Sequence, residues 1–145
     1  MNLKERFHEL TVEELSYVAG FFDGEGTTGI YSGSIIAAVC NTDRTVLDWL
    51  KESFGGSILM HKPKPPRKPL YRWTVAAWDA FDFLLTIQPY VRMKVDRIDV
   101  ALEFQRTIKR GSGPNHYSTD EQDYRELLCE LMRSFNRRGN AQPIG

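Results

Sequence analysis

The sequence predicts an α+β fold in which helices pack on one face of a four-stranded antiparallel sheet. Three observations support this fold class. A helical pattern opens the chain, two pairs of short β-type segments follow with a helical pattern between them, and the rest is helical. An amphipathic helix has to bury its apolar stripe, and a sheet face is a natural surface for it. With 145 residues the chain is one domain by size, with a core at about 11–110 and an added helix at about 118–138.

The first helix is expected to begin at Thr11, because Thr11 and Glu14 have the spacing of a capping box. It ends in the nonapeptide Val18–Gly26, where small residues and glycines alternate with aromatic residues and acids. Gly20 and Gly24 are four residues apart and therefore share one helix face. A face without side chains lets a second backbone approach closely, which points to a homodimer.

The later elements follow from β-branched runs, helical periodicity and glycine or proline breaks. We predict strands at 27–31, 35–41, 57–61 and 70–76, a turn at 32–34, and helices at 43–54, 77–86, 91–109 and 118–138. Asp43 is a candidate cap for the second helix, and Ser118 with Glu121 opens the last one. The apolar face of that last helix is predicted to consist of Tyr124, Leu127, Leu128, Leu131 and Phe135.

The end of the first helix concentrates negative charge. Helix C-termini present unpaired carbonyls and the negative pole of the helix dipole, and Glu25 adds a carboxylate to that field. A cation would stabilise this arrangement, and Mg²⁺ suits it because it prefers oxygen ligands. The alternative is an ordinary glycine cap with surface acids. A calcium loop does not fit, because Thr28 stands where such a loop needs Gly and Ser34 where it needs Glu.

The nonapeptide resembles the signature of the LAGLIDADG homing endonuclease family. It consists of an apolar residue, Ala-Gly, two bulky residues, Asp-Gly, an acid and a final Gly. Later landmarks of the family are matched at 41–47, 54–56 and 88–94. The resemblance therefore extends from Thr11 to about Lys109, and it implies that the signature helix forms the subunit interface. The interface residues would be Ala19, Gly20, Asp23 and Gly24. A single copy of the signature implies a homodimer.

The same resemblance implies the catalytic residues. Glu25 would bind the catalytic metal, Mg²⁺ or another divalent cation such as Mn²⁺ or Ca²⁺, together with the backbone carbonyl of Gly24. Lys94 matches the position of an active-site lysine, and a solvated lysine at the start of a helix is the alternative. Asn41 matches a residue that touches the water shell of the metal, and a cap for the next helix explains it equally well. Asp23 is expected to be mainly structural.

A second signal does not depend on the family. The segment from Ser53 to Trp78 contains no acid and carries cations interleaved with aromatic residues. The side chains expected to bind DNA are Lys62, Lys64, Arg67, Lys68, Tyr71 and Arg72, with Arg44 added by the resemblance. Cations suit phosphate contacts, and side chains on a two-stranded ribbon can reach base edges in the major groove. The alternatives are a solvated basic loop and a proline-rich ligand for another domain.

The first predicted hairpin is different, because residues 26–42 contain no charged side chain. In relatives that recognise long sites, the first strands are usually longer and carry many base-reading side chains. This chain is therefore expected to read fewer base pairs in each half-site, or to read them more loosely.

Composition sets limits on localisation and partners. The formal net charge is zero, so the local distribution of charge has to provide any attraction to a polyanion. Cys40 and Cys129 do not make a disulfide framework, so a reducing compartment, the cytosol or an organellar matrix, is expected. No apolar run approaches membrane-spanning length and the first ten residues contain no signal-peptide core, so no membrane partner is expected.

Together these observations predict a homodimeric, divalent-metal-dependent endonuclease that hydrolyses both strands of a roughly palindromic double-stranded DNA site. The alternative is a non-cleaving nucleic-acid-binding relative of the same fold, either an RNA maturase or a transcriptional regulator. A third possibility, a structural dimerisation domain, would explain the signature helix but would leave the acid-free basic hairpin without a purpose.

Overall fold

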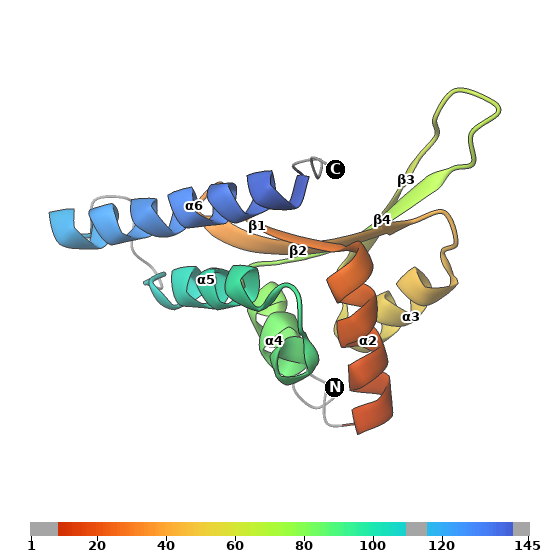
Figure 1. The fold of residues 1–145 in the computed structure, drawn as a ribbon, viewed down its shortest axis with the longest axis horizontal. Helices are drawn as coiled ribbons and strands as arrows, with labels where there is room; N and C mark the ends of the chain where they lie inside the picture. Colours follow the sequence, from red (N-terminus) through yellow and green to blue (C-terminus); the bar gives the residue numbers. More distant parts are fainter. Residues whose placement is uncertain (1–8, 110–115, 141–145) are drawn as a thin grey trace.

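The computed structural model describes residues 9–109 and 116–140, and it confirms the α+β fold (Figure 1). The helices are α2 (Val12–Glu25), α3 (Thr45–Phe54), α4 (Ala77–Ile87), α5 (Val95–Arg106) and α6 (Thr119–Asn140), with a 3₁₀ turn η1 (Gln88–Tyr90) before α5. The strands are β1 (Gly26–Tyr31), β2 (Ser34–Asn41), β3 (Ser57–His61) and β4 (Leu70–Ala76). They form one antiparallel sheet in the order β1-β2-β4-β3. Figure 1 shows α2 to α5 on one side of the sheet and α6 beside β1.

The core lies between the sheet and the helices on that side. Alternate residues of the central strands point toward the helices and are buried, namely Ile35, Ala37 and Val39 from β2 and Trp73 and Val75 from β4. β-branched and aromatic side chains suit this pleated, covered surface.

Phe83 of α4 joins the layers by meeting three rings edge-on. Its centroid lies 5.6 Å from that of Phe22, 4.8 Å from that of Phe54 and 5.0 Å from that of Trp73. The indole N–H of Trp73 donates to the carbonyl oxygen of Gly55 at 2.8 Å, so this large buried ring leaves no unsatisfied donor. These contacts fix α2 against the centre of the sheet.

The opposite face of the sheet is not covered by α2 to α5, and we call it the open face. Directly paired residues of an antiparallel sheet share a face. Along β1 and β2 the open face therefore carries Thr27, Gly29, Tyr31, Ser34, Ile36, Ala38 and Cys40. Along β3 and β4 it carries Ser57, Leu59, His61, Leu70, Arg72 and Thr74. Its one Lys or Arg side chain within the strands is Arg72, and the β3–β4 hairpin projects beyond the helices (Figure 1).

Several predicted boundaries are confirmed. Thr11 and Glu14 form the capping box at the start of α2, and Ser118 and Glu121 cap α6 in the same reciprocal way. β3 and β4 match the predicted strands. The turn between β1 and β2 consists of Ser32–Gly33, both with positive φ, which is the geometry that a two-residue hairpin requires.

Two helices begin later than predicted. α5 begins at Val95 and not at 91, because Val91 is extended, with ψ of 143°, and the N–H groups of residues 92–94 go to the carboxylate of Asp23. α3 begins at Thr45 and not at 43, and Arg44, without a side-chain cap, takes the N-cap position predicted for Asp43. The carboxylate of Asp43 still accepts the N–H of Thr45 at 2.9 Å.

The predicted apolar face of α6 is wrong in part. Leu128 and Met132 are buried, whereas Tyr124, Leu127 and Leu131 are 41%, 50% and 38% exposed. The helix carries two neighbouring apolar stripes, and only one of them packs on α5 and β1. Periodicity alone does not distinguish between such stripes.

Within residues 9–109 and 116–140, no helix combines the length and the apolar character that crossing a membrane requires.

Candidate functional site

Lys94 closes the C-terminal end of α2. Its ammonium group donates to the carbonyl oxygen of Phe22 at 3.1 Å and to that of Asp23. These carbonyls carry the negative end of the helix dipole, so the contact is charge-assisted. Burial lowers the pKa of Lys94 and the neighbouring Arg97 acts in the same direction, whereas the carboxylates of Asp23 and Glu25 raise it. The lysine is therefore not the freely solvated side chain that the alternative interpretation required.

Asp23 holds the other half of this junction. Its carboxylate accepts the backbone N–H groups of Arg92 at 2.7 Å, Met93 at 3.1 Å and Lys94 at 3.1 Å. The side chain is 8% exposed, so the three bonds satisfy a nearly buried charge. Asp23 thus ties α2 to the segment before α5, in the structural role expected for it.

Glu25 lies where α2 becomes β1. It is the last residue of the helix and is exposed, and the next N–H, that of Gly26, donates to the carbonyl oxygen of Phe22. A Cβ on Gly26 would lie 2.2 Å from a ring carbon of Phe22, so only glycine fits there. The chain therefore passes from helix to strand without a loop, and the carboxylate of Glu25 stands at the end of the helix.

The exposed surface of α2 includes the two glycines of the predicted interface. Gly20 and Gly24 are exposed, and a Cβ on either would meet nothing within 4 Å in the same protomer. Ala19 and Asp23 are instead buried inside the protomer, so a helix-to-helix contact would have to rest on the glycines.

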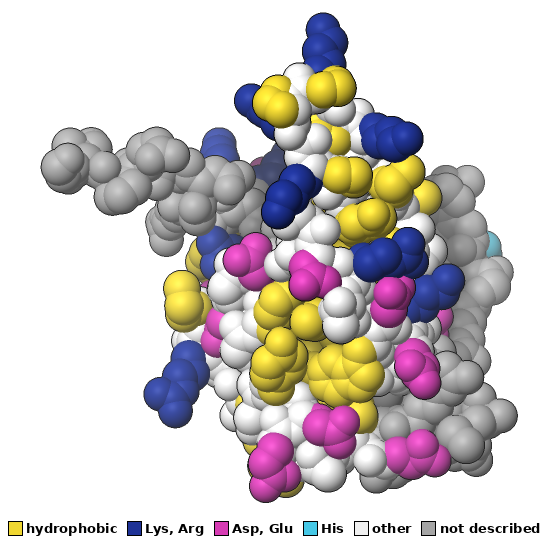
Figure 2. Space-filling model, turned by 90° about the vertical axis from the view of Figure 1, so that its right-hand side faces the viewer, with side chains coloured by type: hydrophobic (Ala, Val, Ile, Leu, Met, Phe, Trp, Pro, Cys, Tyr) yellow, Lys and Arg dark blue, Asp and Glu magenta, His cyan; other side chains and the backbone are white. Residues whose placement is uncertain are grey.

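The exposed surface at Gly20 and Gly24, which we call the glycine strip, has a groove on one side and an aromatic cluster on the other. On one side a groove of about 380 Å³ lies between Ser16 and Gly20 of α2 and Tyr90 of η1. On the other side Tyr17 stacks on Phe21 with a centroid distance of 6.3 Å and meets Trp49 of α3 at 6.1 Å. Tyr17 is 54% exposed. Figure 2 looks at this side of the molecule and shows apolar side chains gathered below the hairpin with acids around them.

Asn41 and Arg44 are both occupied by local contacts. The Asn41 side-chain oxygen accepts the N–H of Asp43 at 2.8 Å, so Asn41 shapes the turn into α3. Arg44 pairs with Asp48 at 2.9 Å and lies over the ring of Tyr71 at 5.2 Å. Because this ion pair is exposed to solvent, it is weak, and Arg44 can exchange Asp48 for another anion.

The predicted DNA-binding cations divide between two places. Lys62, Lys64, Arg67 and Lys68 are all exposed in the connection between β3 and β4, and Figure 2 shows Lys and Arg side chains on the projecting hairpin. Arg72 lies on the open face of the sheet, where its guanidinium reaches the sulfur of Cys40 at 4.0 Å. Tyr71 is half-buried on the helix-covered face, opposite to the face that carries Arg72.

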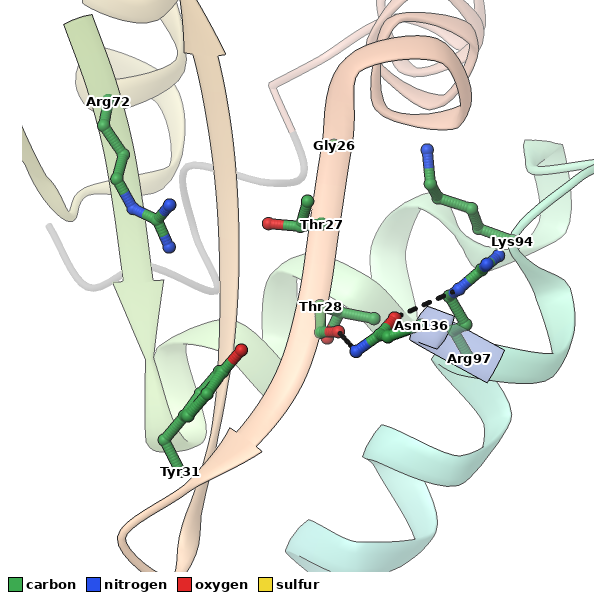
Figure 3. Close-up of a pocket in the computed structure, with 8 residues that line it drawn as sticks. All are labelled: Gly26, Thr27, Thr28, Tyr31, Arg72, Lys94, Arg97 and Asn136. Carbon is green, nitrogen blue, oxygen red and sulfur yellow. Dashed lines mark hydrogen bonds between the residues drawn. The ribbon is translucent and has the colours of Figure 1, made fainter. Parts of the chain in front are cut away.

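A cavity of about 340 Å³ lies at the β1 edge of the sheet, near α5 and α6 (Figure 3). We call it the cationic cavity. It is lined by Gly26, Thr27, Thr28, Tyr31, Arg72, Lys94, Arg97 and Asn136. The Nε–H of Arg97 donates to the Asn136 side-chain oxygen at 3.2 Å, and the amide nitrogen of Asn136 donates to the carbonyl oxygen of Thr28 at 3.2 Å. The cavity therefore joins Lys94 to residues that the sequence did not single out.

Comparison with solved structures identifies this arrangement of elements. The archaeal intron-encoded homing endonuclease I-Vdi141I, complexed with DNA, has a TM-score of 0.66 and 18% identity, covering 92% of this chain and 86% of that one. The homing endonuclease I-CvuI, in complex with its target in the presence of Ca, has a TM-score of 0.64 and 15% identity, covering 92% and 84%. The LAGLIDADG homing endonuclease I-SmaMI, bound to cleaved DNA, has a TM-score of 0.59 and 16% identity, covering 84% of this chain and 44% of that one.

The chain has the LAGLIDADG homing endonuclease fold. No family model matches the sequence, and no curated protein does. The likeness therefore lies in the fold.

Sequence analysis did not single out Thr27, Tyr31, Arg97 or Asn136, which line the cationic cavity. Arg97 follows Lys94 by three residues, which places both on one side of a helix start, and this signal was available. Asn136 is separated from Thr28 by 108 residues, and no local pattern predicts such a contact.

The first testable expectation concerns Asp23. Replacing it by Ala leaves the N–H groups before α5 without their acceptor, and we expect the free energy of unfolding to fall by about 2–3 kcal/mol. Asp96→Ala is the matched control, because Asp96 is an exposed acid in the first turn of α5 and its loss should cost less than about 1 kcal/mol. Urea unfolding followed by circular dichroism measures both. Equal losses in the two variants would contradict the role assigned to Asp23.

Proposed function

We propose that this chain is a divalent-metal-dependent DNA endonuclease that works as a homodimer and cuts both strands of a roughly palindromic site. The observation that carries the proposal is the junction of α2, β1 and Lys94. There an exposed carboxylate and a half-buried ammonium group meet at the edge of an open sheet face. The hairpin that extends this face contains no acid and ends in exposed cations. A hydrolytic site beside a polyanion-binding surface is what a nuclease needs.

The donor atoms at the junction fit a hard divalent cation. The carboxylate of Glu25 and the backbone carbonyl of Gly24 would hold it, since Mg²⁺, Mn²⁺ and Ca²⁺ all take oxygen ligands. Within the described part of one protomer, no three His, Cys, Asp or Glu side chains come together. A complete ligand set would therefore draw on the partner's Glu25, on water and on phosphate oxygens. When bound, the metal would supply an activated water and neutralise charge on the phosphate.

The protein groups at the junction have separable tasks. Lys94 is held in place by the carbonyls at the end of α2, so its charge can stabilise the negative charge that develops on a phosphate without first having to reorient. Asp23 fixes the backbone that carries Lys94. Glu25 has no such structural duty and remains exposed, as a metal ligand must be.

Dimerisation through the glycine strip of α2 would bring two such junctions together. Two-fold symmetry of the protein then requires two-fold symmetry of the target. Each open face would cover one half-site. Because β1 and β2 carry mostly small side chains on that face, base reading would fall mainly to the β3–β4 hairpin.

The alternative remains a nucleic-acid-binding protein that does not cut. The neutral net charge and the small side chains of the first hairpin favour it. The retained Glu25 and the placement of Lys94 favour the nuclease, because binding alone requires neither a metal ligand nor a positioned ammonium group. The experiment that separates the two is a magnesium-dependent nicking assay on a randomised duplex library.

In that assay we expect Glu25→Gln to abolish cleavage while DNA binding is kept. Glutamine preserves the shape but removes the anionic oxygen that a hard metal prefers, and the loss of a negative charge near phosphate should not weaken binding. Glu126→Gln is the control, since it removes an exposed acid from α6. Lys94→Met should slow cleavage by about 10²–10³-fold, the usual effect of losing one charge-stabilising group. A Gln variant that cuts at the wild-type rate would eliminate Glu25 as the metal ligand.

For the dimer we expect Gly20→Leu to yield a folded monomer. Within the protomer a side chain at Gly20 meets open space, and leaving Gly should favour the helix by up to about 1 kcal/mol. Any disruption must then come from a clash with the partner. Sedimentation at micromolar concentration compares this variant with wild type and with Glu130→Leu, which places a leucine at an exposed position of α6. A monomeric wild-type protein, or a dimeric Gly20→Leu variant, would refute the interface.

Salt dependence tests the hairpin. If about half of its cations touch phosphate, the dimer neutralises roughly five phosphates, and the binding constant should fall with salt with a log–log slope of about −4 to −5. Changing Lys64 and Arg67 together to Gln should flatten that slope by about two to four. Lys51 with Arg106 is the matched control pair, both exposed on helices behind the sheet. Filter binding over a range of salt gives the slopes, and a slope unaffected by the hairpin changes would exclude the hairpin as the binding surface.

A further inference from the structure

The walls of the cationic cavity are rich in donors. Lys94 and Arg97 come from the start of α5, Arg72 from β4, and Thr27 and Tyr31 from β1, and no Asp or Glu is among the residues that line it. Figure 3 shows Arg72, Thr27 and Tyr31 on one side of β1 and Lys94, Arg97 and Asn136 on the other. Lysine and arginine can only donate hydrogen bonds, so a space enclosed by them requires a ligand that accepts.

Internal contacts use only part of this donor capacity. The ammonium group of Lys94 has three protons, and two point to carbonyls of α2. Arg97 donates from Nε to Asn136 and from Nη2 to the carbonyl oxygen of Phe135 at 2.8 Å, which leaves N–H groups of its fork for a ligand. Within the strands, the guanidinium of Arg72 makes a weak contact with the sulfur of Cys40 at 4.0 Å.

Size and charge restrict the ligand further. One water takes up about 30 Å³ in the liquid, so a cavity of about 340 Å³ holds a phosphate-sized group together with several waters. The neighbouring charges of Lys94 and Arg97 repel one another, and an anion placed between them would offset that repulsion. The planar fork of Arg97 suits bidentate contact with phosphate oxygens.

We infer that the cationic cavity binds one phosphate group of a nucleic-acid backbone, and that Arg97 is its central cation. The inference rests on the proposed function for the source of the phosphate. The cavity adjoins the junction of α2 and β1, since Gly26 and Lys94 both line it. A backbone phosphate bound there fixes the strand relative to Glu25 without touching a base, so it contributes position and not sequence preference.

Helix α6 completes this phosphate site. Asn136 accepts from Arg97 and donates to the carbonyl oxygen of Thr28, so it holds the guanidinium against β1. Asn136 is a positioning residue, because it acts on the ligand through Arg97. The C-terminal helix thereby gains a task in binding, beyond covering the edge of the sheet.

The test begins with inorganic phosphate and needs neither metal nor DNA. Phosphate is titrated into the wild-type protein at constant ionic strength, with chloride as the balancing anion, while NMR follows the arginine Nε–H signals. We expect saturable shifts for Arg97 and Arg72. Arg97→Gln should weaken phosphate binding at least tenfold, and Asn136→Ala should weaken it less. Arg106→Gln should leave it unchanged, because Arg106 belongs to the same helix but lies over Phe81 and beside Glu103.

The second arm uses duplex DNA and the Glu25→Gln background without metal. Arg97→Gln should weaken binding to all sequences alike and flatten the log–log salt slope by about two, one phosphate for each protomer. If Arg97→Gln disturbs α6, Tyr31→Phe and Arg97→Lys provide the same comparison with less structural change, and each should weaken phosphate binding severalfold.

The outcomes are separable. Linear, non-saturating shifts, or an equal loss in Arg106→Gln, overturn the cavity as a phosphate site. Saturable phosphate binding with an unchanged DNA salt slope overturns the nucleic-acid assignment and leaves a site for free phosphate. A wild-type protein that binds no duplex at any salt refutes the proposed function, while the phosphate titration still decides whether the cavity binds an anion.

Discussion

The exchange between the end of α2 and the start of α5 is the interaction on which the rest of this structure depends. The carboxylate of Asp23 satisfies the N–H groups before α5, and in return the ammonium of Lys94 satisfies carbonyls at the end of α2. Each helix end has unpaired backbone groups, and each is capped by a charge of the appropriate sign from the other. One pair of residues therefore holds two elements 69–72 positions apart in sequence and brings Lys94 to the same end of the helix as Glu25.

Helix α2 has one set of residues that packs inside the protomer and another set that is exposed. Phe22, Ala19 and Asp23 are turned inward and hold the protomer together. Gly20, Gly24 and Glu25 are turned outward, and the protomer needs no side chain at either glycine. In the proposed dimer, this bare surface, bordered by an aromatic cluster and a groove, would receive the partner helix, and the carboxylate of Glu25 would stay accessible to a ligand.

Local sequence patterns predicted what local forces determine. β-branched runs between glycine and proline breaks placed the strands, and capping boxes placed the starts of α2 and α6. Local patterns were insufficient where distant contacts decide the outcome. The segment before α5 is not helical and gives its N–H groups to Asp23, and Asn136 meets Thr28 across most of the chain. The residues that build a site together are brought there by packing, and periodicity carries no information on that.

The zero net charge of the chain, which argued against binding of a polyanion, does not describe how the charges are distributed over the fold. The first turns of the helices behind the sheet carry acids, among them Glu13, Asp48, Asp79 and Asp96. There they complement the positive helix ends and contribute to helix stability. Cations gather on the hairpin and around the cavity, although Lys51 and Arg106 also lie exposed on the helices behind the sheet. Since salt screens exposed charges beyond about 8 Å at physiological ionic strength, a ligand on the open face meets the near cations and little of the acids behind the sheet. A zero net charge therefore does not exclude a local attraction for anions at the hairpin and the cavity.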